Sequence, residues 1–225
     1  MIAVEEVSVR IGRNQILRKV TVDIPTNGVV TGLFGPNGAG KTTLIRLLVG
    51  VINRYDGSVS RQLDGPIVYH PDSGYLYPFL RISDCLDLFE ALYADFDRRK
   101  AAGFIGDLGL SADQKVGEAS KGMSEQLHLA LAISRAAGLY VFDEPLASVD
   151  PLTRDSLVDL MLHHRNPGSG ILISTHLIGG IEPLFDHIVM MSDGGIVAAG
   201  DVGEIRQDSP DASLEGIYKE RLRAV

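Results

Sequence analysis

The chain has 225 residues, a formal net charge of −8 and a single cysteine, Cys85. This length suits one large α/β domain, or one domain with a subdomain. The acidic surplus argues against a nucleic-acid partner, and one cysteine excludes an intramolecular disulfide, so we expect Cys85 to be a small buried hydrophobe. Met1 is soon followed by Glu5 and Glu6, and no apolar run reaches about 18 residues, so we expect neither a signal peptide nor a transmembrane segment.

Up to about residue 70 the pattern is mostly that of strands. β-branched and apolar residues predict short strands at 4–9, 20–24, 29–34, 58–60 and 67–69. Gly12-Arg13-Asn14 is a turn signal between the first two. Leu44 to Leu48 recur at helical spacing after a Gly-rich loop, and Gly50 is the expected end of that helix.

Helices dominate the middle of the chain, from about Ser83 to Ala136. The helical stretches cover 86–93, 101–108 and 127–136. Continuous apolar strands return at 139–142 and 171–174, as is typical of parallel strands buried on both faces, and weaker strands follow at 187–191 and 196–199. A charged helix is expected near Leu214–Arg223. We therefore predict an α/β fold with a mainly parallel sheet, an N-terminal antiparallel β subdomain and a helical subdomain inserted at about 75–136.

The most informative stretch is a nine-residue loop between the strand at 29–34 and the following helix. It consists of Gly35, Pro36, Asn37, Gly38, Ala39, Gly40, Lys41, Thr42 and Thr43, and it fits G-x-x-x-x-G-K-[ST]. Its glycines let successive N–H groups cradle a polyphosphate, Lys41 supplies a positive charge, and Thr42 supplies a hydroxyl for Mg²⁺. A plain Gly-rich turn is the alternative, but a chance match in this length has odds of about 1%. The loop predicts a nucleoside triphosphate site in a P-loop NTPase core.

A second group of polar residues follows two later strands. Asp143 and Glu144 end the apolar strand at 139–142, where an open sheet places ligands, and Asp143 lies 102 residues after Lys41. Asp143 could hold Mg²⁺ and Glu144 could orient or deprotonate a water, although a polar strand end before a turn is the alternative reading. His176 follows the strand at 171–174 in the position of a γ-phosphate contact. The other histidines, His70, His128, His163, His164 and His187, are expected in solvated or core roles.

Together these motifs resemble the nucleotide-binding subunit of ABC transporters over almost the full length, as a single ATP-binding domain at 1–225. The loop is similar to Walker A, Leu139–Asp143 to Walker B, and Glu144 and His176 to the catalytic glutamate and the switch histidine. Ala147-Ser148-Val149-Asp150 resembles the D-loop. Most diagnostic is Ala119-Ser120-Lys121-Gly122-Met123, which is similar to the LSGGQ signature and precedes an apolar helix.

The resemblance implies an ATPase that closes head to tail with a second nucleotide-binding domain around two Mg-ATP molecules. Ser120, Gly122 and a helix starting near Ser124 would cap the γ-phosphate held by Lys41 of the partner, with Asp150 in the same interface. Separate integral membrane permease subunits would use the cycle for transport, so the resemblance places the chain at the cytoplasmic face of the membrane as a peripheral subunit.

Three positions depart from the family pattern. Ile11 stands where an aromatic residue usually stacks on adenine, and it can still pack on the base. Asp72 replaces the glutamine of the Q-loop and could ligate Mg²⁺. Ala119 and Lys121 replace the first and third signature residues. None of these changes removes Lys41, Asp143, Glu144 or His176, so we expect hydrolysis.

The Lys-Gly-Met form of the signature and the segment Leu92–Asp97 resemble the branch that contains bacterial drug and antibiotic exporters. Two other functions stay open on the residues alone. One is a soluble ABC ATPase of an assembly pathway, such as Fe–S assembly, and the other is a module that binds ATP without hydrolysing it.

Overall fold

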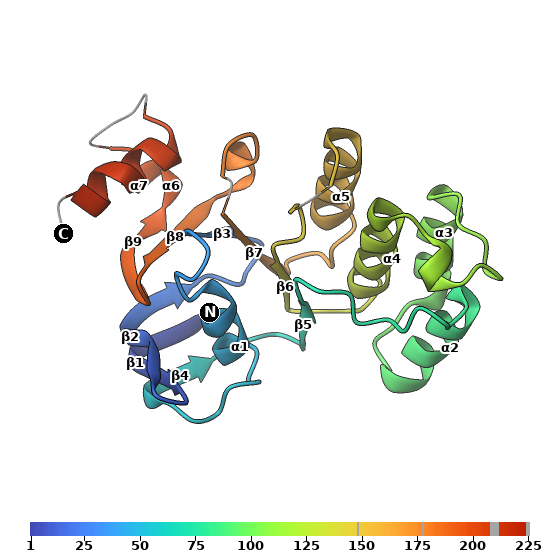
Figure 1. The fold of residues 1–225 in the computed structure, drawn as a ribbon, viewed down its shortest axis with the longest axis horizontal. Coiled ribbons are helices and arrows are strands. Elements are labelled where there is room, and N and C mark those ends of the chain that lie inside the picture. The colour runs from blue at the N-terminus through green and yellow to red at the C-terminus, as the bar shows by residue number, and fades with distance from the viewer. Residues whose placement is uncertain (148, 177, 208–211, 224–225) are drawn as a thin grey trace. The chain divides into compact units, whose positions relative to one another are not determined.

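A computed structural model of the chain describes residues 1–147, 149–176, 178–207 and 212–223 (Figure 1). The chain divides into two compact units. The first unit comprises Met1–Asp64 and Gly168–Val225, and the second comprises Gly65–Pro167.

The first unit contains most of the strands. Its elements are β1 (Ile2–Ile11), β2 (Asn14–Ile24), β3 (Val30–Phe34), α1 (Lys41–Leu48), β4 (Asp56–Arg61), β7 (Gly170–Thr175), a 3₁₀ turn (Glu182–Leu184), β8 (His187–Ser192), β9 (Gly195–Asp201), α6 (Val202–Ile205) and α7 (Leu214–Arg223). The second unit contains β5 (Ile67–His70), α2 (Ile82–Leu92), α3 (Arg98–Asp107), a 3₁₀ turn (Val116–Glu118), α4 (Lys121–Ile133), β6 (Leu139–Asp143) and α5 (Pro151–His163).

Two sheets organise the first unit. The antiparallel sheet has the order β2-β1-β4, and the second sheet has the order β7-β3-β8-β9, in which β7, β3 and β8 are parallel and β9 is antiparallel. Every residue of β3 and β7 is buried, as the continuous apolar runs predicted. The turn between β1 and β2 passes through Gly12 at φ 62°, and Gly50 follows α1 at φ 82°, so both turn predictions are confirmed.

Helices dominate the second unit and share one apolar core. Ile82, Cys85 and Phe89 of α2, Ile105 of α3 and Leu127 of α4 lie in this core. Cys85 is fully buried, as expected for a small hydrophobe. The unit also holds the parallel strand pair β5 and β6. The α/β prediction, with its antiparallel β part and its inserted helices, is confirmed; the single domain at 1–225 stays a prediction.

The structure corrects the prediction at three helices, of which the short α6 (Val202–Ile205) lies where no helix was predicted. α4 begins at Lys121, and not near Ser124, because the Ser120 hydroxyl accepts a hydrogen bond from the Met123 backbone N–H at 3.2 Å and caps the helix one turn earlier. α5 has no counterpart among the predicted helices. Its start is nevertheless encoded, since Asp150 caps it and Pro151 occupies its first turn. No helix in the described part of the chain is both long enough and apolar enough to cross a membrane.

Candidate nucleotide site

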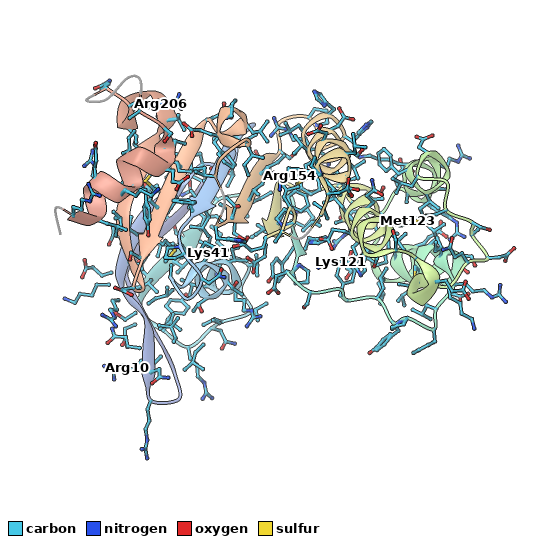
Figure 2. All side chains as sticks on the ribbon, turned by 45° about the horizontal axis from the view of Figure 1, so that its top comes forward. Arg10, Lys41, Lys121, Met123, Arg154 and Arg206 are labelled. Atoms are coloured by element: carbon cyan, nitrogen blue, oxygen red, sulfur yellow. The ribbon has the colours of Figure 1, made fainter. Side chains whose placement is uncertain are left out.

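The phosphate loop connects β3 to α1 in the first unit. Gly38 and Gly40 adopt φ values of 84° and 103°, which favour glycine, and a β-carbon on Gly35 would lie 2.5 Å from the Met191 carbonyl oxygen. Lys41 is the first residue of α1 (Figure 2) and only 6% exposed. Its ammonium donates to the Gly35 and Pro36 carbonyl oxygens at 2.7 and 3.3 Å, so the loop curls around its own lysine.

This geometry fits a polyphosphate. The first N–H groups of an α-helix have no partner within the helix, and the positive end of the α1 dipole lies where Gly40 meets Lys41. Thr42 and Thr43 follow Lys41 in the first turn of α1 and are partly exposed. The loop therefore combines left-handed glycines, a helix N-terminus and a buried lysine, which are features of triphosphate sites.

His176 leaves the sheet beside this loop. β7 pairs with β3 in parallel register, with Phe34 opposite Thr175. The residues that follow, Gly35 and His176, therefore leave neighbouring strands at the same edge. A ligand at that edge is within the reach of both strand ends.

The second unit carries the predicted carboxylates in an analogous arrangement. β5 and β6 are parallel, with His70 opposite Phe142, so the chain segments bearing Asp72 and Asp143 leave neighbouring strands at one edge. Asp72 is exposed, whereas Asp143 is fully buried. Burying a carboxylate is costly, so an aspartate at the end of an apolar strand points to a role beyond packing.

Glu144 adopts an unusual backbone conformation directly after β6. Its φ is 51°, in the left-handed region that costs a non-glycine residue about 1–2 kcal/mol. Such strain is concentrated at functional sites. Asp143 and Glu144 thus combine a buried carboxyl group with a strained backbone.

The predicted signature and D-loop lie together in the second unit. Ser120 caps α4 and Asp150 caps α5, and a β-carbon on Gly122 would lie 3.3 Å from the Thr153 hydroxyl oxygen. Both Asp150 carboxylate oxygens accept hydrogen bonds from Thr153, from its N–H at 3.1 Å and from its hydroxyl at 2.5 Å. These bonds from Thr153 hold the Asp150 pKa below its ordinary value.

The N-termini of α4 and α5 therefore lie side by side. Lys121 and Met123 flank Gly122 in the first turn of α4 (Figure 2). Thr153 did not figure among the predicted site residues, although the N-cap Asp150 followed by Pro151 is a recognisable helix start. Ser148 of the predicted D-loop lies outside the described residues.

Ile11 lies at the end of β1, where the β1–β2 hairpin turns. Its side chain is 55% exposed, and Arg10 beside it points away from the hairpin (Figure 2). An exposed aliphatic residue can pack on a base, and this position of Ile11 leaves its side chain accessible for that contact.

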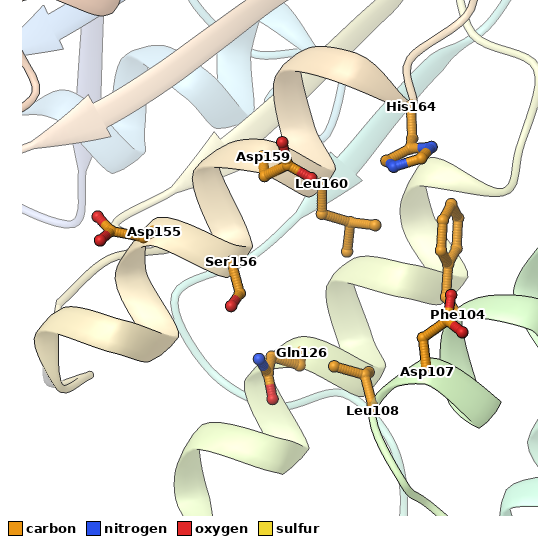
Figure 3. Close-up of a pocket in the computed structure, with 9 residues that line it drawn as sticks. All are labelled: Phe104, Asp107, Leu108, Gln126, Asp155, Ser156, Asp159, Leu160 and His164. Carbon is orange, nitrogen blue, oxygen red and sulfur yellow. The ribbon is translucent and has the colours of Figure 1, made fainter.

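A cavity of about 490 Å³ lies within the second unit (Figure 3). It opens between α3, α4 and α5, with Phe104, Leu108 and Leu160 as apolar lining and Asp155 and Asp159 among its polar lining. It includes none of the predicted site residues. This cavity therefore does not coincide with the predicted nucleotide site.

Comparisons with known proteins identify the family. The family model described as "ABC transporter" matches residues 17–147. The chain is 27% identical to the ABC-type transporter ATP-binding protein EcsA of Bacillus subtilis (strain 168), covering 98% of this chain and 96% of that protein. It is 30% identical to the uncharacterised ABC transporter ATP-binding protein YdbJ of the same organism, covering 94% of this chain and 73% of that protein.

Solved structures agree with this family. An ATP-binding subunit of an ABC transporter superposes with a TM-score of 0.84 at 28% identity and covers 99% of both chains. A dimeric ATP-binding cassette bound to ADP and Pi, with a TM-score of 0.75 at 19% identity, shares the fold over 90% of this chain and 99% of that chain. The protein belongs to the ABC transporter family and is an ATP-binding subunit of the P-loop class.

Proposed function

We propose that this chain hydrolyses Mg-ATP in a head-to-tail dimer and thereby powers export through separate membrane subunits. The observation that carries this proposal is the phosphate loop, with Gly38 and Gly40 in left-handed conformations and Lys41 buried at the start of α1. Family membership supplies the ATP-binding role, and the residues after β6 and β7 supply candidates for the chemistry.

Lys41 and the loop N–H groups bind the β- and γ-phosphates in this proposal. An approaching phosphate offers the Lys41 ammonium a charged acceptor in place of the Gly35 and Pro36 carbonyls that it now contacts. Thr42 and Asp143 would hold Mg²⁺, which neutralises phosphate charge, and Asp72 is a further oxygen donor. Mg²⁺ beside phosphates usually keeps several waters and needs only one or two protein carboxylates.

Glu144 acts as the general base, or orients the attacking water, and His176 contacts the γ-phosphate. Hydrolysis of a phosphoanhydride depends on positioning and electrostatics, so two well-placed polar groups make a large contribution. The strained backbone of Glu144 supports this role, because strain fixes the direction of its side chain.

The α4 start caps the γ-phosphate of a partner copy. Ser120 and Gly122 lie in the cap and first turn of a 13-residue helix, whose N–H groups and dipole attract an anion. This half-site implies a dimer, because the anion comes from the Lys41 loop of a second domain.

The membrane subunits dock, in this proposal, on an aromatic surface of the second unit. Tyr77 and Phe79 are 64% and 68% exposed, and their rings stack with centroids 5.4 Å apart. The same unit contains a cavity of about 290 Å³, whose lining includes Tyr69, Tyr75 and Arg135. Exposed aromatic side chains are typical of protein interfaces.

Hydrolysis is tested by phosphate release from the purified chain. The wild type is expected to release phosphate only with Mg²⁺, at a rate that rises cooperatively with protein concentration. Lys41→Ala and Glu144→Gln should each lower kcat by about 100-fold or more. A wild-type rate equal to that of Lys41→Ala would identify a module that binds ATP without turning it over.

The dimer is tested by size-exclusion chromatography. Glu144→Gln keeps the shape of the side chain but removes the base, so saturating Mg-ATP should convert this variant to a stable dimer, while Lys41→Ala in the same background stays monomeric. A Glu144→Gln variant that is monomeric under these conditions contradicts the head-to-tail arrangement.

The partner is tested by affinity purification from the native membrane. A multi-spanning membrane protein should co-purify, and Phe79→Ser should weaken its recovery without changing phosphate release by the isolated chain. Recovery of a soluble scaffold in its place would support the assembly-pathway function instead.

A further inference from the structure

His128 lies in the middle of α4 and is only 3% exposed. Its Nε2 atom accepts two backbone hydrogen bonds, from the Tyr75 N–H at 3.2 Å and from the Leu76 N–H at 3.3 Å. These donors lie 53 and 52 residues away in the sequence. One side chain of the signature helix thus holds two consecutive peptide groups of the segment between β5 and α2.

The hydrogen bonds determine the tautomer. Because Nε2 accepts from two N–H donors, the ring proton is on Nδ1, which donates to the Ser124 carbonyl oxygen at 2.6 Å. A protonated ring would have no lone pair at Nε2. Only neutral His128 can hold the Tyr75 and Leu76 amides.

The surrounding side chains are shaped for this contact. The Tyr75 hydroxyl donates to the His128 carbonyl oxygen at 2.9 Å, and the two rings meet edge to face with centroids 4.7 Å apart. A β-carbon on Gly74 would lie 3.3 Å from His128 Nε2, so glycine allows the close approach. The segment is therefore attached to α4 by three hydrogen bonds that all involve one residue of the helix.

The attachment joins two predicted site elements within the second unit. Asp72 lies three residues before Tyr75, and Ser120 caps the helix that carries His128. We propose that His128 is a positioning residue, which makes the Asp72 segment and the signature end of α4 move as one body during the ATP cycle. This inference rests on the proposed ATPase function.

Several titratable groups face His128. From β5 the His70 ring approaches with centroids 6.2 Å apart, and its Nε2 atom lies 3.6 Å from a carboxylate oxygen of Glu125 on α4. From the attached segment comes Tyr75. Burial lowers the His128 pKa, against the opposing effect of the Ser124 backbone hydrogen bond. The ring is therefore neutral at pH 7, and the attachment is complete there.

Two substitutions separate the effect of the hydrogen-bond acceptor at position 128 from the effect of side-chain packing. His128→Gln places an amide oxygen close to the position of Nε2, so it retains an acceptor for the two N–H groups but cannot titrate. His128→Leu fills similar volume without any acceptor. Both variants keep the buried position occupied, and folding of each is checked by circular dichroism.

Amide hydrogen exchange of the full-length chain measures the attachment directly. In His128→Leu the protection of the Tyr75 and Leu76 amides should fall about tenfold, roughly the loss of one hydrogen bond, whereas His128→Gln should retain it at pH 7. After correction for intrinsic rates, the wild type should lose this protection progressively below about pH 6.5, and His128→Gln should not. Equal protection in the wild type and His128→Leu, or a wild type that matches His128→Gln at every pH, overturns the inference.

Kinetics then test the positioning role. His128→Leu should lower kcat for ATP about tenfold, because misplaced groups slow chemistry, while the ADP affinity of the Lys41 loop in the first unit stays unchanged. Rescue of kcat by His128→Gln is expected. Lost protection with unchanged kcat contradicts positioning, whereas a wild type without ATP hydrolysis contradicts the proposed function and leaves the exchange result standing.

Discussion

Glu144 shows how a single residue can reveal a functional role through its backbone. Its φ of 51° requires a conformation that favours glycine, yet the chain has a glutamate there. A strand end that needed only a turn would be served better by glycine. Glu6, Lys19 and Asp193 share this conformation, so it is the position of Glu144 directly after the buried Asp143 that makes the strain consistent with a base.

This interpretation predicts a separation of stability from activity. Glu144→Gly should raise the free energy of unfolding by about 0.5–1 kcal/mol, since the relief of strain exceeds the extra entropy of glycine in the unfolded chain. Glu144→Gln keeps the β-carbon and should leave stability unchanged. Urea denaturation measures both, and phosphate release should be lost in both. Identical unfolding curves for the two variants would show that the backbone of Glu144 stores no strain.

α4 illustrates how one helix combines structural and functional roles. Ser120 satisfies a backbone donor at its start, Gly122 lets Thr153 of α5 come close, and His128 in its middle holds the Tyr75–Leu76 segment. The cap alone explains why a serine is suitable at position 120. A phosphate role therefore needs a variant that preserves the cap.

Ser120→Ala and Ser120→Asp distinguish the two roles. Ser120→Ala should lower the free energy of unfolding by about 1 kcal/mol through loss of the cap. Ser120→Asp retains an acceptor and should unfold like the wild type, but its charge repels a γ-phosphate. In the Glu144→Gln background, Ser120→Asp should therefore abolish the ATP-dependent dimer seen by chromatography. A persisting dimer would assign Ser120 to capping alone.

The pH dependence of stability is a property of the whole molecule, because buried titratable groups occur in both units. Burial lowers the pKa of His70 to about 4 and lowers the pKa values of His128 and His187. Each such histidine binds its proton more readily in the unfolded chain. Its contribution to the free energy of unfolding is therefore fully present above about pH 6.5. This contribution is lost as the pH falls toward the pKa of the folded state.

Glu125 opposes this loss, because burial raises its pKa to about 6. Its carboxyl group takes up a proton more readily in the folded chain, which favours folding as the pH falls from about 6 to about 4.5. Urea denaturation should show stability falling most steeply just below pH 6.5 and less steeply below pH 6. Protonation of His70 alone lowers the free energy of unfolding by about 3 kcal/mol by pH 4. Glu125→Gln removes the opposing effect and should make the decline steeper between pH 6 and 4.5; an unchanged slope contradicts this account.

Local signals in the sequence were sufficient to predict the phosphate loop and the buried strands. The loop at residues 35–40 can be predicted because the backbone angles of its glycines exclude most other residues. β3 and β7 can be predicted because strands that are buried on both faces are apolar throughout. The same logic failed for α5. Only Leu157, Leu160 and Met161 are buried on it, so its apolar pattern is too weak to indicate a helix, although Asp150-Pro151 encodes its start.

The residues of this chain specify by themselves which segments form strands, where the phosphate loop bends and which strand ends carry carboxylates, since these depend on neighbours a few positions away. Folding in three dimensions sets the pairing of β3 with β7, which brings His176 to the edge of the loop, and the contact of His128 with Tyr75 and Leu76. Periodicity reports that a side chain is buried, but it carries no information about the partner. A hydrogen bond across 53 residues therefore emerges only when the helices pack.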